Sequence, residues 1–559
     1  MIKITKKEMC CACTACAKIC PIGCITMKED EEGFLYPSVD ESKCVHCGKC
    51  EKVCPILRAD EGTPETEGLK PEPDAVGGWN KDEAVREASS SGGAFSLLAD
   101  KILERGGVIF GAALKDMKVC HIAVTDQTGL ALLRGSKYVQ SVVGDSYPQV
   151  KEYLEQGKEV LFSGTPCQTA GLRSFLGKEY EKLYLVDFIC HGVPSPKVFS
   201  DYISSVEKKE NAEVVDFRFR LKDKGWHPSG LQLGTKVKLS NGKEIRKYPA
   251  LKDTYMNAFL ENLDLRPSCY DCRFKSVPKW GADITIADFW GVSKVMPEMN
   301  DKKGTSLLLL NTDKGARLFE EVKDRFHYKD TNWQAATKKN PTLVRPAKRP
   351  ILRDTFFPEL EERGYDKVAR KHLSTTTTFF RKGFGILGGK MKQVILKIAG
   401  TFAKLLHIKF TEERQQKLIQ FLKFCTVGVT NVAVSYLTNI CTILLLGKIC
   451  PGLEYDYVVA NITAFLVAVY WSFIWNSKKV FNFRTKDKAL RRRVIFRTYM
   501  CYGLSGIVVN NILGTIWIKG LGISKMISPL LNLFVTIPLN FITNKYWAYA
   551  PKKEDKPEP

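Results

Sequence analysis

Eight cysteines near the start of the chain have the number and spacing that iron–sulfur chemistry uses. The spacing C-x2-C-x2-C-x3-C-P occurs twice, at Cys10, Cys13, Cys16 and Cys20 and again at Cys44, Cys47, Cys50 and Cys54. Thiolates in such runs bind [4Fe–4S] clusters. Zinc sites also use C-x2-C pairs, but zinc explains neither the third and fourth cysteine of each run nor the proline that follows. The sequence therefore predicts two [4Fe–4S] clusters in residues 1–57.

The two runs are similar to those of two-cluster bacterial ferredoxins, which have an α+β fold. In that fold the fourth cysteine of each run reaches across to the other cluster. The resemblance implies that Cys54 completes the cluster of the first run and that Cys20 completes the cluster of the second. Cys11 and Cys24 fall outside the spacing, and we expect them to be small buried residues rather than ligands. Because so short a segment buries little surface, the clusters would also stabilise it.

Composition and charge limit the class of protein. The chain has 559 residues, which predicts several domains, and 19 cysteines, which cluster at the N-terminus as metal ligands do rather than as a disulfide framework. We therefore expect a reducing compartment, and no secretory signal precedes the first cysteine run. The formal net charge of +23 raises the question of nucleic acid. Since the basic residues concentrate beside apolar spans near the C-terminus, membrane topology explains them better, and we predict no nucleic-acid partner.

The middle of the chain has the pattern of an α/β (α+β) domain. Residues 58–74 are acidic and rich in Pro and Gly, which predicts a linker. Short apolar runs and helical patterns then alternate through residues 75–360. The expected strands include residues 108–110, 160–162 and 184–186, and the expected helices include residues 94–103 and 168–176.

Three small-residue turns in this domain could hold a phosphate-bearing cofactor. Small residues let backbone N–H groups approach an anion, above all at the start of a helix. An ordinary cap or tight turn would give each pattern by itself, but three such turns within about eighty residues favour a cofactor site. The candidate contacts are Ser90, Ser91, Gly92 and Gly93 in the first turn, Gly135, Ser136, Lys137 and Tyr138 in the second, and Gly164 and Thr165 in the third.

Four further cysteines are candidates for a third [4Fe–4S] cluster. Thr165 and Gln168 form a T-x-x-Q capping box with Pro166 at the first helical position. This places Cys167 in the first turn of a helix, where a thiolate is favoured. The expected ligands are Cys167, Cys190, Cys269 and Cys272. The alternative is that Cys167 or Cys190 is a buried apolar residue, and Cys120, without a partner in the sequence, is expected in the core.

These motifs resemble the beta subunit of coenzyme F(420)-reducing hydrogenases and dehydrogenases. The resemblance is carried by SSSGGAF (89–95), GSKYVQS (135–141), GTPCQ (164–168), DFICHGVPS (187–195), FRLKDKGW (219–226), CYDCRF (269–274), ADITIADFWG (282–291) and GTSLLLLNTDKG (304–315). It implies an iron–sulfur flavoprotein that binds FAD and exchanges hydride with a deazaflavin, and it favours the third cluster. Asp283 and Asp288 either have a functional role or merely cap or pair with Arg273. His191, Lys137 and Trp290 lie in matching motifs without an assigned proton-transfer role.

The last third of the chain predicts an all-α membrane domain. Residues 361–417 are basic, and Met391–Phe410 could form an interfacial amphipathic helix or a packed core helix. Four apolar spans follow, at residues 424–447, 458–475, 498–518 and 526–543. Nine Lys and Arg residues lie between the second and third spans. The positive-inside rule therefore predicts a multi-pass protein of the cell membrane with both termini and the redox domains in the cytoplasm.

The four spans form two similar hairpins. Phe473-Ile474-Trp475-Asn476 at the end of the second span matches Phe541-Ile542-Thr543-Asn544 at the end of the fourth. Residues 418–550 resemble the GtrA-like family, which is associated with polysaccharide assembly and with movement of polyprenyl-linked sugars. Asparagines within the spans could mark a substrate path, or they could serve only in hydrogen bonds between helices.

The predictions combine into a membrane-bound iron–sulfur flavoprotein oxidoreductase. Electrons would pass between an external ferredoxin-like partner, the clusters and FAD, with hydride exchange to a deazaflavin, NAD(P)H or another soluble carrier, and with a link to envelope polysaccharide synthesis. The alternative is a GtrA-like carrier of lipid-linked sugars, with the redox half as a regulator. In a third hypothesis the spans are only an anchor.

Overall fold

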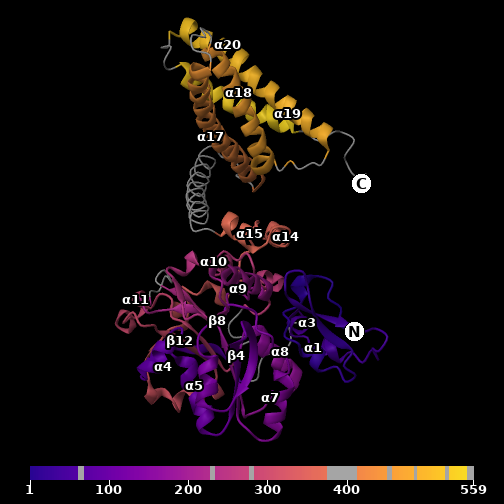
Figure 1. Cartoon of the computed structure of the whole chain (residues 1–559), viewed down its shortest axis with the longest axis vertical. Coiled ribbons are helices and arrows are strands. Elements are labelled where there is room, and N and C mark those ends of the chain that lie inside the picture. Colours follow the sequence, from indigo (N-terminus) through magenta and orange to yellow (C-terminus); the bar gives the residue numbers. More distant parts are fainter. Residues whose placement is uncertain are drawn as a thin grey trace. The chain divides into compact units, whose positions relative to one another are not determined.

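The computed structural model describes residues 1–60, 68–226, 233–275, 282–373, 412–449, 456–481, 483, 487–522 and 528–549. The chain divides into two compact units, Met1–Lys382 and Gly383–Pro559, whose elements are labelled in Figure 1. The amphipathic helix expected at Met391–Phe410 lies outside the described residues.

The N-terminal domain is built from short elements around its cysteine loops. Its elements are η1 (Lys7–Met9), α1 (Ala15–Lys18), the antiparallel pair β1 (Ile25–Glu29) and β2 (Leu35–Val39), α2 (Lys49–Lys52) and α3 (Pro55–Asp60). Thr14 and Gly48 have positive φ angles of 68° and 72° and cap the N-termini of α1 and α2. These left-handed positions turn each cysteine run back on itself, so that its first three cysteines lie close together.

A mixed sheet forms the core of the central domain. In the described part of the chain the strand order is β13-β3-β12-β11-β7-β6-β4-β5, and the central strands β11, β7, β6 and β4 are parallel. The strands are β3 (Leu69–Asn80), β4 (Val108–Lys115), β5 (Lys118–Val124), β6 (Val160–Gly164), β7 (Leu183–Phe188), β11 (Ile284–Asp288), β12 (Ser306–Thr312) and β13 (Phe326–Thr331).

Helices cover both faces of this sheet, because alternate residues of a buried strand point to opposite sides. Ile109 points to the side of α5 (Ala94–Glu104), α6 (Gln127–Leu133) and α12 (Asp313–Glu320). Val108 and Phe110 point to the side of α7 (Ser146–Glu155) and α8 (Pro166–Leu176). The sequence-predicted strands and helices in this region are confirmed. The shorter elements at the edges are α4 (Glu83–Ala88), α11 (Val292–Val295), α13 (Trp333–Thr337), η4 (Pro297–Met299), η5 (Lys323–Arg325) and η6 (Pro341–Leu343).

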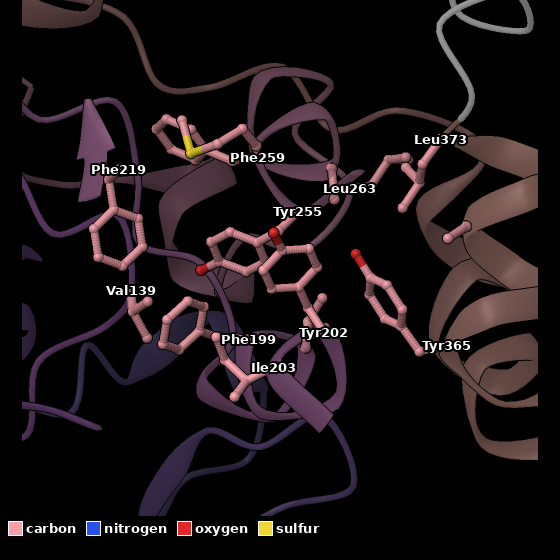
Figure 2. Packing of buried hydrophobic residues seen from close by; sticks show 14 of the residues in the cluster. Val139, Phe199, Tyr202, Ile203, Phe219, Tyr255, Phe259, Leu263, Tyr365 and Leu373 are labelled. Carbon is pink, nitrogen blue, oxygen red and sulfur yellow. The ribbon is translucent and has the colours of Figure 1, made fainter. Parts of the chain in front are cut away.

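In the second part of the central domain, an aromatic cluster packs against a sheet of three antiparallel strands. Its elements are β8 (Val214–Leu221), β9 (Gly234–Leu239), β10 (Glu244–Lys247), α9 (Pro196–Glu210), η2 (Ala250–Lys252), α10 (Thr254–Leu260), η3 (Pro267–Asp271), α14 (Arg353–Arg363) and α15 (Tyr365–His372). Figure 2 shows Tyr202, Tyr255 and Tyr365 packed together in this cluster. Because Tyr365 and Leu373 belong to it, the domain continues past the predicted end at residue 360.

The expected linker at residues 58–74 differs from the structure at both ends. Helix α3 continues to Asp60, and strand β3 already begins at Leu69. The acidic and Pro-rich composition of residues 69–74 hides the strand, because this part of β3 is largely exposed and its pairing with β12 is irregular between Leu310 and Thr312.

The C-terminal unit is helical. It contains α17 (Glu412–Ile449), α18 (Asp456–Trp475), η7 (Asn476–Val480), α19 (Lys488–Gly503), η8 (Leu504–Val509), α20 (Asn510–Thr515), η9 (Ile516–Gly520), α21 (Ser528–Thr543) and η10 (Asn544–Ala548). By length and composition, the stretches Lys423–Ile449 and Val458–Lys478 are apolar enough to cross a membrane. The third expected span is not one regular α-helix, because α19 starts ten residues early, at Lys488, and the π-helical turns η8 and η9 follow it.

The two matching hairpin ends adopt the same local structure. Asn476 and Asn544 each begin a π-helical turn at the end of an apolar helix, and each is fully buried. The Nδ2 of Asn476 lies 3.3 Å from the hydroxyl of Tyr502, and the Nδ2 of Asn544 donates to the carbonyl of Asn540. The repeat seen in the sequence is therefore also a structural repeat.

Candidate functional site

The eight N-terminal cysteines surround two separate hollows. Cys10, Cys13, Cys16 and Cys54 line one, which we call the proximal hollow, and Cys20, Cys44, Cys47 and Cys50 line the other, the distal hollow. This grouping is the crossed pairing that the ferredoxin resemblance implies. Among the described residues, no group of three or more His, Cys, Asp or Glu side chains is placed to hold one metal ion. The cysteines are instead arranged around spaces, as a multi-iron cluster requires.

Cys11 and Cys24 are both buried, as expected from the sequence, and each contacts cluster-ligand candidates. Cys24 lines the distal hollow, and its sulfur lies 3.4 Å from that of Cys20. Cys11 lines the proximal hollow and also the third cysteine hollow described below, and it packs in one buried cluster with Cys13 and with Cys167 of the central domain.

One fully buried arginine, Arg266, forms hydrogen bonds between the central domain and the N-terminal domain. The guanidinium of Arg266 donates to the carbonyls of Cys10 (2.7 Å) and Leu35 (2.9 Å) and to Oε1 of Gln140 (3.1 Å). It also lies over the ring of Tyr36, 4.3 Å from the centroid. Gln140 in turn donates to the carbonyl of Cys11. Charged donors make stronger hydrogen bonds than neutral ones, so this side chain fixes the cysteine loop in position.

Helix α8 approaches the same loop closely (Figure 1). A Cβ atom at Gly171 would lie 2.8 Å from Cβ of Cys13 and 2.8 Å from the hydroxyl of Tyr147. Only glycine fits there. The apolar side chains of α1 and α3 join those of α7 and α8 in a common core, and therefore the N-terminal domain is packed against the central domain rather than merely tethered to it.

The four other candidate cysteines meet in a third hollow. Cys167 comes from the first turn of α8, Cys190 follows β7, and Cys269 and Cys272 lie on and after η3; all four line one space. The capping box of Thr165 and Gln168 is present, as the sequence predicted. The side chains of Arg266 and Lys275 line the same hollow, and Lys275 donates to the carbonyls of Cys190 and Thr342. Four thiolates beside two cations fit the anionic cluster that they were predicted to hold.

A cavity of about 430 Å³ opens beside this third hollow. Its volume lies within the range of sites for organic ligands. It lies at the carboxyl ends of the parallel strands, where β6 ends at Gly164, β7 at Phe188 and β11 at Asp288. Open α/β sheets bind their ligands at this edge.

The three small-residue turns predicted from the sequence meet at this cavity. The backbone N–H and the hydroxyl of Ser136 both contact Oγ of Ser90, at 2.7 and 2.9 Å, which joins the first two turns. Nine of the ten predicted contact residues line the cavity, namely Ser90, Ser91, Gly93, Gly135, Ser136, Lys137, Tyr138, Gly164 and Thr165. Gly92 lies behind them: its N–H donates to Ser306, and a Cβ there would lie 2.4 Å from the carbonyl of Gly78.

His121 in the cavity wall was not found from the sequence. Its Nε2 lies 3.0 Å from the carbonyl of Ser163 and its Nδ1 lies 2.7 Å from the hydroxyl of Ser141. Since a carbonyl only accepts, Nε2 carries the proton and Ser141 donates to Nδ1. Burial lowers the pKa of His121 to about 4. The ring is therefore neutral near pH 7 and connects β5 to the end of β6.

A buried ion pair closes another side of the cavity. Arg220 on β8 donates to both carboxylate oxygens of Asp288, at 2.7 and 3.0 Å, and its guanidinium lies 5.6 Å from the ring centroid of Trp290. The prediction that Asp283 or Asp288 pairs with Arg273 is wrong. Asp288 pairs with Arg220, while Asp283 accepts from the backbone of Leu185 and from Thr312, and Arg273 pairs with Asp271.

The remaining predicted residues lie in different places. His191 lines both the third hollow and the large cavity, and its Nε2 lies 2.6 Å from Oδ1 of Asn262. Trp290 stacks on Trp226, with centroids 5.3 Å apart. Cys120, expected in the core, is half-buried on β5.

Family models match three successive parts of the chain. Residues 9–56 match the 4Fe-4S dicluster domain. Residues 157–332 match the C terminus of the beta subunit of coenzyme F(420) hydrogenase/dehydrogenase. Residues 423–549 match the transmembrane domain of GtrA/DPMS.

No curated protein matches the sequence. A chain of the F(420)-reducing [NiFe] hydrogenase complex from Methanosarcina barkeri is similar at 17% identity and a TM-score of 0.33, over 55% of this chain and 94% of that one.

The fold, the cysteine sites and the family matches define an iron–sulfur redox protein with a membrane domain. In chain order, its segments are similar to a 4Fe–4S dicluster domain, to the C terminus of the F(420) hydrogenase/dehydrogenase beta subunit and to a GtrA-like transmembrane domain. The GtrA-like match and the two long apolar helices indicate membrane association.

Proposed function

We propose that this protein is a flavin-dependent iron–sulfur oxidoreductase that exchanges electrons with a ferredoxin-like partner and hydride with a soluble carrier, a deazaflavin or NAD(P)H. The observation that carries the proposal is the continuity of the sites. Cys11 and Ile56 line both the proximal hollow and the third hollow. Thr165, Cys190 and His191 line both the third hollow and the large cavity.

FAD is the cofactor that fits the large cavity. Serine hydroxyls, glycine N–H groups and the amine of Lys137 supply donors for phosphate oxygens, and the cavity wall also carries aromatic and apolar side chains such as Tyr138 and Ile286. Flavin chemistry joins one-electron and two-electron transfer. The residues of this chain would bind the cofactor, exclude water from it and hold it next to the third hollow, whose four cysteines are suited to a third [4Fe–4S] cluster.

The proposal is tested on the full-length protein after anaerobic purification in detergent. We expect about twelve irons per chain, as three clusters of four, and one bound flavin in the visible spectrum. Reduced deazaflavin and NADPH are then tried separately as reductants of that flavin. Protein that retains its iron but contains no flavin, and acquires none from added FAD, would contradict the proposal.

Lys137 gives the site a pH dependence. Burial, with a smaller contribution from the like charge of Arg218, lowers the pKa of its amine to about 7. The amine is therefore charged below that pH and neutral above it. We expect the affinity of flavin-free protein for FAD to fall about tenfold as the pH rises from about 6 to 8, measured by quenching of flavin fluorescence at constant ionic strength. Lys137→Met should flatten this profile, whereas Lys151→Met on the exposed face of α7 should not. The same slope in Lys137→Met and in the native protein would refute the assignment.

The membrane domain is proposed to be multi-pass, with the redox domains and both termini in the cytoplasm. The support is the basic segment between the second and third spans, which includes Arg491, Arg492 and Arg493 on α19. A fluorescent reporter fused after Pro559 should be active only if this end is cytoplasmic. A phosphatase reporter, active only outside the cytoplasm, gives the opposite readout.

A second candidate function is movement of a lipid-linked sugar, with the redox half as a regulator and with a role in polysaccharide synthesis. The observation that favours it is the pair Asn476 and Asn544, whose Oδ1 atoms are buried and have no hydrogen-bond partner among the described residues. Such acceptors could receive sugar hydroxyls. Alanine at both positions should abolish transfer of a polyprenyl-linked sugar across vesicles while leaving flavin reduction intact; unchanged transfer excludes this role for the pair.

A further inference from the structure

One cysteine outside the cluster spacing lies between two cluster sites. Cys11 is 7% exposed. Its side chain lines both the proximal hollow and the third hollow, and it packs in one buried cluster with Cys13 of the dicluster domain and Cys167 of the third hollow. It is therefore a single side chain in contact with both cysteine cages. Cys24 shows that this is not a general property of the extra cysteines, because Cys24 contacts Cys20 and lines the distal hollow but neither of the other two.

The surrounding structure holds Cys11 in this position. The carbonyl of Cys11 accepts from Gln140, and the carbonyl of the preceding Cys10 accepts from Arg266. Gly171 brings α8, which carries Cys167, against Cys13. Three independent contacts thus fix the distance between the two cages, and the apolar core around α1 and α8 keeps water out.

The charge at this position is also unusual. Arg266 is fully buried and lines the third hollow. Its partners are two carbonyls and an amide oxygen, and among the residues that the structure describes no carboxylate forms an ion pair with it. Burying an unpaired cation is costly. The negative charge that balances it must therefore come from the thiolate cages on either side, and this charge increases when a cluster is reduced.

We propose that Cys11 is the electron-transfer junction between the proximal cluster and the cluster of the third hollow, and that Arg266 positions it. The transfer moves one electron, oxidises the donor cluster and reduces the acceptor cluster, and makes or breaks no bond at Cys11. The sulfur of Cys11 fills the gap between the two cages, and electron transfer slows steeply as such a gap widens. This inference rests on the proposed third cluster. It also implies the order of electron transfer through the dicluster domain, in which the distal cluster is farther from the third hollow than the proximal cluster.

The test compares Cys11→Ala with the control Cys120→Ala in full-length protein loaded with iron and flavin, because Cys120 lines none of the three cysteine hollows. A reduced viologen radical generated by a light flash delivers one electron, and the appearance of the one-electron-reduced flavin is followed by absorbance. We expect Cys11→Ala to retain the native iron content and the native cluster signals in electron paramagnetic resonance. The internal transfer should slow by about tenfold or more, which corresponds to about 1.4 kcal/mol of activation free energy. Cys120→Ala should transfer at the native rate.

Two results would contradict the proposed role of Cys11 in electron transfer. An unchanged transfer rate in Cys11→Ala would show that electrons cross elsewhere. Loss of about four irons would show that Cys11 is a ligand instead. Cys11→Ser serves as a second variant of nearly native size if the alanine variant fails to fold, and the same two outcomes apply to it. A native protein with about eight irons would refute the third cluster itself, which separates failure of the proposed function from failure of the junction.

Discussion

Replacing Cys269 with alanine is expected to lower the iron content from about twelve to about eight per chain. Cys269 lines the third hollow, and its sulfur accepts a hydrogen bond from the backbone N–H of Val193 at 3.4 Å. Removal of one of four thiolates leaves an incomplete cage around an anionic cluster. The dicluster domain should still be reduced by dithionite, but its electrons should no longer reach the flavin.

Two measurements decide this prediction. Iron is determined chemically, and the clusters are counted by integrating their electron paramagnetic resonance signals after reduction. Cys120→Ala is the control, because Cys120 is half-buried on β5 and lines none of the three cysteine hollows. Equal iron in Cys269→Ala and Cys120→Ala would refute the third cluster.

Replacing Arg266 with glutamine is expected to loosen the dicluster domain from the central domain. The variant loses charged donors to the carbonyls of Cys10 and Leu35 and leaves these acceptors buried. Hydrogen bonds to charged groups contribute about 1.5–3 kcal/mol each, so we expect the free energy of unfolding to fall by about 3–5 kcal/mol. Arg266→Lys should not restore it, because one ammonium group cannot reproduce the planar fork over Tyr36.

Thermal unfolding and amide hydrogen exchange measure this effect. The exchange of the segment from Cys10 to Leu35 should accelerate more than that of the central sheet. Arg349→Gln is the matched control: Arg349 is exposed, its guanidinium lies 5.6 Å from the ring centroid of Tyr270, and it forms an ion pair with Asp354. Such an exposed pair contributes about 0–1 kcal/mol. Native exchange rates in Arg266→Gln would mean that the two domains are held together without this arginine.

The sequence predicted the residues of the third hollow and of the cavity by their types, but it predicted local geometry only for parts built from short segments. The cysteine spacing predicts the proximal and distal hollows, because cysteines with two residues between them in a turn point toward one centre. The Thr165–Gln168 capping box predicts the start of α8, because both partners lie within one helical turn. In each case a few consecutive residues contain the whole geometry.

The parts that escaped prediction depend on long-range contacts. Arg220 and Asp288 are 68 residues apart, and Arg266 is 256 residues from Cys10. His121 meets Ser163 only because β5 and β6 flank β4 in the sheet. No local pattern marks such pairs. The beginning of β3 escaped for a different reason: its exposed end has the composition of a linker.

The two ends of the dicluster domain are not equivalent. The proximal hollow faces α8, whereas at the distal hollow Cys47 is exposed and Val45 is 63% exposed. In the function proposed above, a ferredoxin-like partner would therefore dock at the distal end, since the central domain packs against the other side. Transfer from the dicluster domain to the third hollow would then be a first-order step, independent of protein concentration, and only the encounters with the ferredoxin-like partner and with the soluble hydride carrier would be bimolecular. The fusion would thus replace a diffusing electron donor with a dicluster domain held permanently against the central domain.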